Sequence, residues 1–162
     1  MSRIIKVGIA DMDAARNPYI LTTLGLGSCV GIALYDSENK IGGLAHIMLP
    51  YSSEFRNNSN PSKFVDTAVE SLLYRMKAMG ANVGKLTGKI AGGARMFGFK
   101  GSTNDILRIG DRNVLAAREV LKDFNIPLLK EDTGGTYGRS IEFHVKDGKM
   151  VIKTIGQGIK II

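Results

Sequence analysis

Hydrophobic positions along the chain follow two different periods, and each period predicts one kind of element. Between residues 61 and 79, apolar side chains recur every three or four residues, which is the spacing of one helix face. Asn60 and Pro61 are typical of a helix start, and Gly80 is typical of a helix end. A second stripe with the same spacing predicts a helix over residues 111–124.

Most other apolar residues lie in short alternating or β-branched runs, which are typical of strands. The segments with this character are 4–10, 19–24, 29–35, 40–49, 85–91, 128–131, 140–146 and 150–155. Asp147 and Gly148, between the last two segments, form a strong hairpin signal. Because short turns join most neighbouring strands, we expect an α+β fold with mostly antiparallel pairing.

The composition of the chain limits the number of domains and the kinds of disulfide or metal site that it can form. The 162 residues are 44% hydrophobic with a mean hydropathy of +0.01, so we expect one core and one domain over residues 1–162. One cysteine and two histidines cannot form an internal disulfide or a four-ligand Cys/His zinc site. We therefore expect no metal or other cofactor.

The same counts favour a reducing, cytoplasmic setting. No apolar run approaches the roughly 18–20 residues of a membrane-spanning helix, and the first residues lack a signal-peptide pattern. We expect a protein that is neither exported nor inserted in a membrane.

The chain is basic, with 22 Lys and Arg against 15 Asp and Glu, a net charge of +7 and a pI near 9.6. This balance favours an acidic partner. The basic residues are scattered and are not interleaved with aromatic residues, as they are in many single-strand binders. Nucleic-acid binding is therefore the least favoured class of function.

The only cysteine is predicted to face a histidine across a β-hairpin. If residues 36–39 form the turn, Tyr35 lies opposite Lys40 and Cys29 lies directly opposite His46. Directly opposed residues of an antiparallel pair have Cβ atoms about 4.5 to 5.5 Å apart. A thiol and an imidazole at that separation can share a proton.

The same register sorts the hairpin into two faces. One face is strongly apolar and is expected to be the core. The other carries Cys29 and His46 among the small residues Gly31, Ala33 and Gly42. Small side chains there predict open space above the sulfur, where a substrate would bind.

A thiol beside an imidazole is the minimum for nucleophilic catalysis, because the thiolate is the reactive form and a neighbouring base generates it. Gly25 and Gly27 permit a tight turn that can aim the backbone N–H groups of Ser28 or Cys29 at a developing oxyanion. Thr23, at the end of the incoming strand, is the best candidate for orienting the imidazole.

Each of these features also has a plain structural interpretation. A lone strand cysteine is usually a small buried hydrophobe, and a lone histidine is usually a hydrogen-bonded structural residue. His144 lies on the polar side of its alternating strand, which indicates a solvated surface residue. Gly25, Gly27 and Gly31 do not indicate a dinucleotide site, because a strand-like segment follows them rather than a helix.

Four motifs resemble those of the CheD family, the chemoreceptor glutamine deamidases of bacterial and archaeal chemotaxis. They are TLGLGSCV at 23–30, AHIMLP at 45–50, GGARMF at 92–97 and EDTGG at 131–135. The resemblance implies a catalytic cysteine, histidine and threonine, which fall on Cys29, His46 and Thr23. From their composition alone, the last two motifs are turns at strand ends that could line a cleft.

The resemblance also implies a reaction and partners. Cys29 would attack a receptor glutamine, ammonia would leave, and the thioester would be hydrolysed to glutamate; some members are thought to cleave glutamyl methyl esters as well. The implied partners are the cytoplasmic region of a chemoreceptor and the phosphatase CheC. The implied fold is a sandwich-like cysteine-hydrolase fold flanked by two or three helices, similar to deamidating toxins. The main alternative is a non-catalytic chemotaxis adaptor that binds receptor and CheC.

Overall fold

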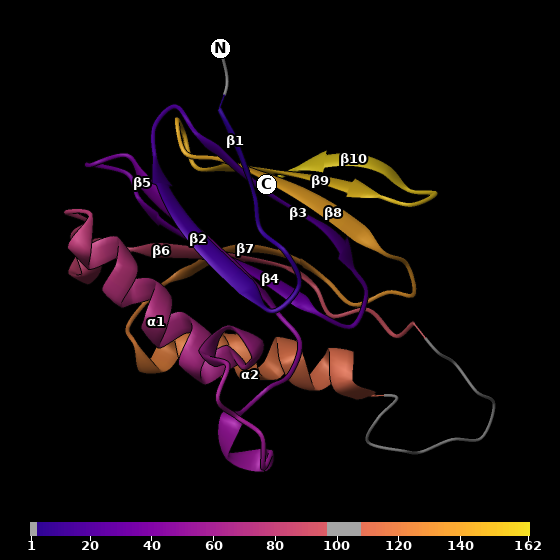
Figure 1. Cartoon of the computed structure of the whole chain (residues 1–162). Helices are drawn as coiled ribbons and strands as arrows, with labels where there is room; N and C mark the ends of the chain where they lie inside the picture. Colours follow the sequence, from indigo (N-terminus) through magenta and orange to yellow (C-terminus); the bar gives the residue numbers. More distant parts are fainter. Residues whose placement is uncertain (1–2, 97–107) are drawn as a thin grey trace, which may run out of the picture.

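The computed structural model describes residues 3–96 and 108–162, drawn in colour in Figure 1. The strands are β1 (Ile4–Lys6), β2 (Asp11–Arg16), β3 (Ile20–Leu26), β4 (Val30–Asp36), β5 (Ile41–Ile47), β6 (Thr87–Gly92), β7 (Leu128–Thr133), β8 (Arg139–His144), β9 (Lys149–Thr154) and β10 (Gly158–Ile161). The α-helices are α1 (Val65–Ala78) and α2 (Ile109–Asp123), and the short 3-10 turns are η1 (Ser52–Glu54), η2 (Pro61–Lys63) and η3 (Val83–Lys85). Phe97, the last residue of the motif at 92–97, lies outside the described residues.

The strands form two five-stranded sheets, with the orders β1-β3-β8-β9-β10 and β2-β5-β4-β6-β7. The pairs β1–β3 and β6–β7 are parallel. The other pairs in the described part of the chain are antiparallel. The predicted α+β fold with mostly antiparallel sheet is confirmed.

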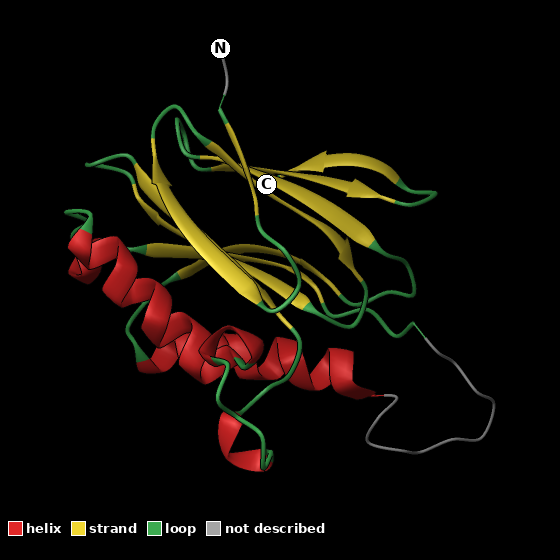
Figure 2. Ribbon diagram, viewed as in Figure 1, coloured by secondary structure: helices red, strands yellow, loops and turns green. Residues whose placement is uncertain are grey.

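The molecule has three layers, with the two sheets face to face and both helices against the second sheet (Figure 2). One core lies between that sheet and the helices; it includes Val30, Ile32, Leu34, Val69, Leu72 and Ala117. The other core lies between the two sheets and includes Leu21, Ala33, Leu44, Ile141 and Phe143. Strands β4 and β5 are buried on both faces, so the hairpin of the sequence prediction is the centre of the molecule.

Both predicted helices are present with altered limits. The segment expected to be one helix from residue 61 begins as η2, and α1 starts only at Val65, because Phe64 is extended with φ −118° and ψ 144°. Phe64 is completely buried in this conformation. Asn60 acts as the expected cap, since its side chain accepts a hydrogen bond from the Ser62 N–H.

Two strands were not predicted, β2 and β10. Strand β2 has the sequence DMDAAR, which is poor in β-branched and aromatic residues, and both Ala14 and Ala15 are buried. In β10 all four residues are exposed. The expected strand over 4–10 stops at Lys6, and Ala10 has a φ of +56° where the chain turns into β2.

The predicted hairpin register is wrong by two residues. Asp36 pairs with Ile41 and Gly31 pairs with His46, so the loop is 37–40 rather than 36–39. Cys29 is therefore not directly opposite His46. A shift of two preserves the alternation of faces. Cys29 itself lies in the bend before β4 and packs against the core between the two sheets, the core that also contains Leu44 of β5.

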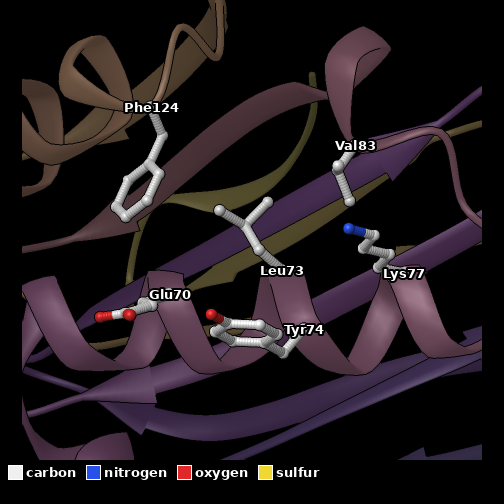
Figure 3. A pocket seen from close by; sticks show the side chains of 6 residues that line it. All are labelled: Glu70, Leu73, Tyr74, Lys77, Val83 and Phe124. Carbon is white, nitrogen blue, oxygen red and sulfur yellow. The ribbon is translucent and has the colours of Figure 1, made fainter.

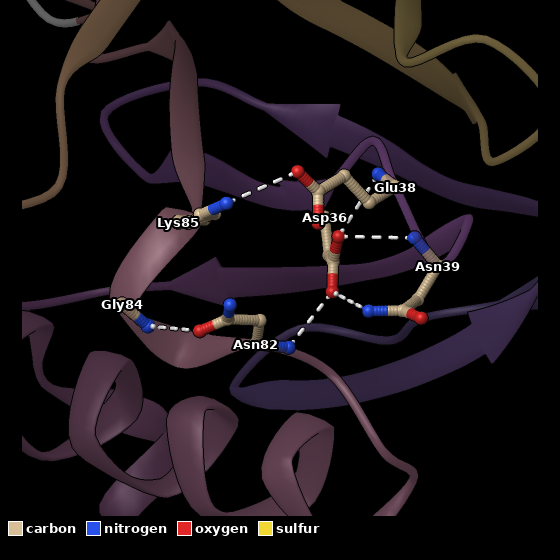
Figure 4. A network of polar contacts seen from close by, with 6 residues as sticks. All are labelled: Asp36, Glu38, Asn39, Asn82, Gly84 and Lys85. Carbon is tan, nitrogen blue, oxygen red and sulfur yellow. Dashed lines mark hydrogen bonds and ion pairs between the residues drawn. The ribbon is translucent and has the colours of Figure 1, made fainter.

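The side chain of Asp36 accounts for the difference (Figure 4). Its carboxylate accepts hydrogen bonds from the backbone N–H groups of Glu38 at 3.0 Å and Asn39 at 3.1 Å. It also accepts one from the N–H of Asn82 at 2.8 Å. Lys40 closes the turn with a φ of +53°. Asp36 thus remains the last strand residue, and the loop moves one residue along the chain.

The expected open space above the hairpin face is also wrong. That face packs on the first sheet, so its small residues make room for protein rather than for a substrate. A Cβ atom on Gly31 would lie 2.9 Å from the Ile141 Cδ1 atom, and one on Gly42 would lie 2.8 Å from the Phe143 Cε2 atom. Access to Cys29 must therefore come from the end of the sandwich.

Candidate active site

Cys29 lies in the bend at residues 27–29 that joins β3 to β4 and leads from one sheet into the other. Two neighbouring N–H groups hold this bend: Ala94 donates to the Gly27 carbonyl at 2.9 Å, and Gly93 donates to the Cys29 carbonyl at 2.8 Å. The motif at 92–97 therefore lines the cysteine bend, as its turn-like composition suggested. The bend is held by backbone contacts on either side of Ser28.

A β-bulge in β3 sets the approach to this bend. Thr23 pairs with Ile141 and Leu26 pairs with Arg139, so β3 has one extra residue between these pairs. Gly25 takes the left-handed conformation expected for it, with a φ of +70°. Gly27 does not have a positive φ; its requirement is space, because a Cβ atom there would lie 2.9 Å from the Met96 Cγ atom.

His46 is completely buried in β5 and is bound by Thr23. The Thr23 Oγ1 atom lies 2.7 Å from the His46 Nδ1 atom and 2.7 Å from the carbonyl oxygen of Val7. The single hydroxyl proton must go to Val7, because a carbonyl can only accept. His46 Nδ1–H therefore donates to Thr23, and the Nε2 atom carries the free lone pair of a base.

The His46 Nε2 atom has no hydrogen-bond partner in the described part of the chain. Burial lowers the pKa of His46 from 6.5 to about 4. Burial raises the pKa of the Cys29 thiol, and the residue's own backbone N–H acts in the opposite direction. At neutral pH the pair is consequently an uncharged thiol and an uncharged imidazole, so proton transfer accompanies attack rather than preceding it.

The low pKa of His46 predicts a pH-dependent stability. A histidine with a pKa of 6.5 unfolded and about 4 folded binds fewer protons in the folded state. Its contribution is fully present above pH 6.5 and is lost as the pH falls towards 4, by about 3 kcal/mol in total. We expect urea unfolding at pH 7.0, 5.5 and 4.5 to show this loss in the wild type but not in His46→Gln. Equal pH dependence in both proteins would contradict the assigned environment.

Cys29 opens into a pocket of about 360 Å³ at the end of the sandwich. The lining residues are Ser28, Cys29, Met48, Leu49, Phe55, Ile109 and Arg112. Most of this surface is apolar, and Arg112 forms an ion pair with Glu54. The first turn of α2 borders the same pocket through Ile109 and Arg112.

The hollow in Figure 3 offers no comparable chemistry. It lies between α1, η3 and the end of α2 and has a volume of about 210 Å³. Its lining residues are Glu70, Leu73, Tyr74, Lys77, Val83 and Phe124. With neither a cysteine nor a histidine in this lining, it has no thiol–imidazole pair like that of Cys29 and His46.

Ser28 and Gly27 were predicted to help bind an oxyanion through the backbone of the bend. Among residues 3–96 and 108–162, no backbone carbonyl accepts a hydrogen bond from the N–H group of Ser28 or of Cys29. Two backbone donors therefore lie beside the thiol. Their use by an oxyanion stays a prediction.

Several residues of the site were not foreseen. Val7, which sets the histidine tautomer through Thr23, was missed because the parallel pairing of β1 with β3, which ends at Lys6 and Thr22, was not predicted. Asn113 of α2 was missed because only the apolar residues of that helix were considered, and because its partners, the Ser28 and Met48 carbonyls, lie far away in the sequence. His144 lies at the end of β8 beside Glu142, on the less buried face, as predicted.

Comparison with known sequences identifies the family of the chain. A family model described as CheD chemotactic sensory transduction matches residues 48–154. The chain belongs to the CheD family. The resemblance of the four motifs is thereby confirmed.

Full-length relatives extend the CheD match to the whole chain. A protein of Caldanaerobacter subterraneus subsp. tengcongensis is 55% identical over 161 residues, which cover 99% of both chains. Relatives from Lachnoclostridium phytofermentans and Syntrophomonas wolfei are 50% and 51% identical, covering 97% and 100% of both chains. Each is named "Probable chemoreceptor glutamine deamidase CheD". Within the described residues, no helix is both long and apolar enough to cross a membrane.

Proposed function

We propose that this CheD-family chain hydrolyses glutamine side chains of chemoreceptor cytoplasmic segments to glutamate and ammonia. The names of its relatives support this substrate and reaction. The observation that carries the proposal is the chain of hydrogen bonds from His46 Nδ1 through the Thr23 hydroxyl to the Val7 carbonyl, here called the relay. It leaves the His46 Nε2 atom without a partner among the described residues, and His46 pairs with Gly31, two residues after Cys29. Because Thr23 occupies the Nδ1 atom, Nε2 is the ring nitrogen left free to take a proton.

In the first step, His46 Nε2 takes the proton of the Cys29 thiol as the sulfur attacks the carboxamide carbon. Catalytic hydrogen bonds of this kind often tighten only with substrate bound. The negative oxygen that forms is expected to bind the Ser28 and Cys29 N–H groups. Thr23 keeps the ring in the Nδ1–H tautomer throughout.

In the second step, the imidazolium of His46 gives its proton to the departing nitrogen, the C–N bond breaks, and ammonia and a thioester are formed. His46 then takes a proton from water, whose oxygen attacks the thioester carbon. Cleavage of the C–S bond returns the thiol and yields glutamate. Overall, one amide and one water molecule are consumed, and one carboxylic acid and one ammonia molecule are formed.

The same thioester route fits a glutamyl methyl ester, with methanol as the leaving group in place of ammonia. The family resemblance also implies the phosphatase CheC as a partner. The net charge of +7 suits acidic receptor segments. These finer features are part of the proposal and have their own assays: methanol release and co-purification with CheC.

The test is to incubate the full chain with a glutamine-containing chemoreceptor cytoplasmic fragment. Peptide mass spectrometry of the fragment and measurement of free ammonia are expected to show matching amounts of glutamate and ammonia. Stoichiometric binding of the fragment without either product would favour the adaptor alternative. Repeating the assay with and without CheC distinguishes an adaptor from an enzyme that its partner controls.

Replacement of Thr23 by valine, which has nearly the same shape, tests the relay. We expect kcat for deamidation to fall about 10- to 100-fold, as is typical when a partner that orients a reactive histidine is removed. Thr23→Ser, which keeps the hydroxyl, is the matched control and should retain most of the rate. A Thr23→Val protein as fast as the wild type would show that the hydroxyl does not orient His46.

A further inference from the structure

The side chain of Asn113 bridges the two halves of the candidate site. It is completely buried in α2, and its Nδ2 group donates to the Ser28 carbonyl at 3.0 Å and to the Met48 carbonyl at 2.9 Å. Ser28 directly precedes Cys29, and Met48 follows His46 by two residues. A single amide group therefore contacts the chain beside the thiol and beside the imidazole.

This bridge lies where the hairpin ladder ends. The last pair of β4 and β5 at this end is Val30 with Ile47, so Ser28 and Met48 are beyond the strand hydrogen bonds. The two hydrogens of a primary amide diverge at a fixed angle, so both carbonyls are held at a set separation. Asn113 therefore links the two chain segments just beyond the last strand pair, at the end of the hairpin that leads to Cys29 on one side and to His46 on the other.

The amide is retained at a cost. The Asn113 Oδ1 atom is buried and has no hydrogen-bond partner among the described residues. Removing the amide would in turn leave the Ser28 and Met48 carbonyls without this donor, so the residue is tied to the two backbone segments and not to helix docking alone. Docking is already served by neighbouring contacts: Gly110 lies so close to the motif at 92–97 that a Cβ atom there would be 2.4 Å from the Ala94 carbonyl oxygen.

We infer that Asn113 is a positioning residue that fixes the Cys29 thiol relative to His46. It contacts neither reacting group, and it acts through the backbone of the cysteine bend and of the segment that follows β5. Its effect on kcat rests on the proposed function. Its effect on thiol chemistry does not, because Cys29 is the only thiol of the chain and can be followed without any receptor.

The experiment compares the wild type with Asn113→Ala, Asn113→Ser and His46→Gln. Val120→Ala is the control, since it removes buried apolar atoms from the same helix two turns away. The first readout is the rate of Cys29 alkylation by iodoacetamide as a function of pH. The second is kcat and KM for the receptor fragment.

Asn113→Ala is expected to lower the rate of Cys29 alkylation at neutral pH, at least half of the way to that of His46→Gln, because an imidazole that is no longer held in place takes the thiol proton less readily. We expect kcat to fall about 10-fold or more while KM changes less than about threefold, because orientation and not substrate binding is lost. Val120→Ala should show neither change. If Asn113→Ala does not fold, Asn113→Ser, which retains one shorter donor, should show a smaller decrease in the alkylation rate.

A folded Asn113→Ala or Asn113→Ser protein with the alkylation profile of the wild type would overturn the inference. An equal decrease in Val120→Ala would also overturn it, because general destabilisation would then be the cause. Absence of deamidation by the wild type would contradict the proposed function alone, since the alkylation profiles would still decide the role of Asn113.

Discussion

Replacement of Cys29 by alanine is expected to lower the rate of receptor deamidation by about 10⁴-fold or more, to the background of the assay. The thiol supplies the nucleophile for the whole covalent route, and in the described part of the chain no second cysteine is present to replace it. His46 and the backbone donors of the bend would remain. They can orient water at the carboxamide, but they cannot form a thioester.

The fold of Cys29→Ala should be retained, because Cys29 is only partly buried and loses a single heavy atom. We expect a change in the free energy of unfolding of about 1 kcal/mol or less. Deamidation is measured by mass spectrometry of the fragment beside a urea unfolding curve of the same sample. A folded Cys29→Ala protein that still converts glutamine at the wild-type rate would exclude the thioester route.

Replacement of His46 by glutamine is expected to lower the same rate by about 10³-fold. In the proposed reaction the imidazole takes the proton of the thiol, gives a proton to the leaving nitrogen and takes a proton from the attacking water. Glutamine still fills the buried site and can bond the Thr23 hydroxyl, but it cannot take a proton from the thiol. The fall should appear in kcat, because His46 is buried and contributes little surface for binding the receptor.

His144→Gln is the matched control, because it changes the only other histidine of the chain. His144 is partly exposed at the end of β8, and its nearest charged partner is Glu142 at 3.5 Å. We expect its rate to be within about twofold of the wild type, as for most substitutions away from a site. Equal losses in both variants would mean that the loss reflects folding and not proton transfer.

The hairpin that carries the candidate pair could be predicted from the sequence, but its register could not. Strand alternation predicted Cys29 and His46 on one face; in the structure Cys29 lies in the bend before β4 and packs against the core between the sheets. The register depended on which residues form the loop. That choice is made by the Asp36 carboxylate and by the N–H of Asn82, a residue far along the chain that sequence reasoning could not bring to the turn.

The surroundings of the pair were predictable only in part. Thr23 was identified from its place before the glycine turn, and it lies 2.7 Å from the imidazole. Val7 and Asn113 act through long-range contacts with backbone atoms, which leave no periodic signal in the sequence. The small residues of the hairpin face were misread for a similar reason. An open face and a face covered by Ile141 and Phe143 of a second sheet have the same alternation.

The most direct measurement traps the nucleophile on the substrate itself. The glutamine that the wild type modifies would be replaced, in the same receptor fragment, by an analogue with a chloromethyl ketone in place of the carboxamide. We expect one covalent adduct per chain, mapped by tandem mass spectrometry to Cys29 and prevented by an excess of the unmodified fragment. A wild-type protein that deamidates the native fragment but is labelled at another residue, or at none, would contradict the account.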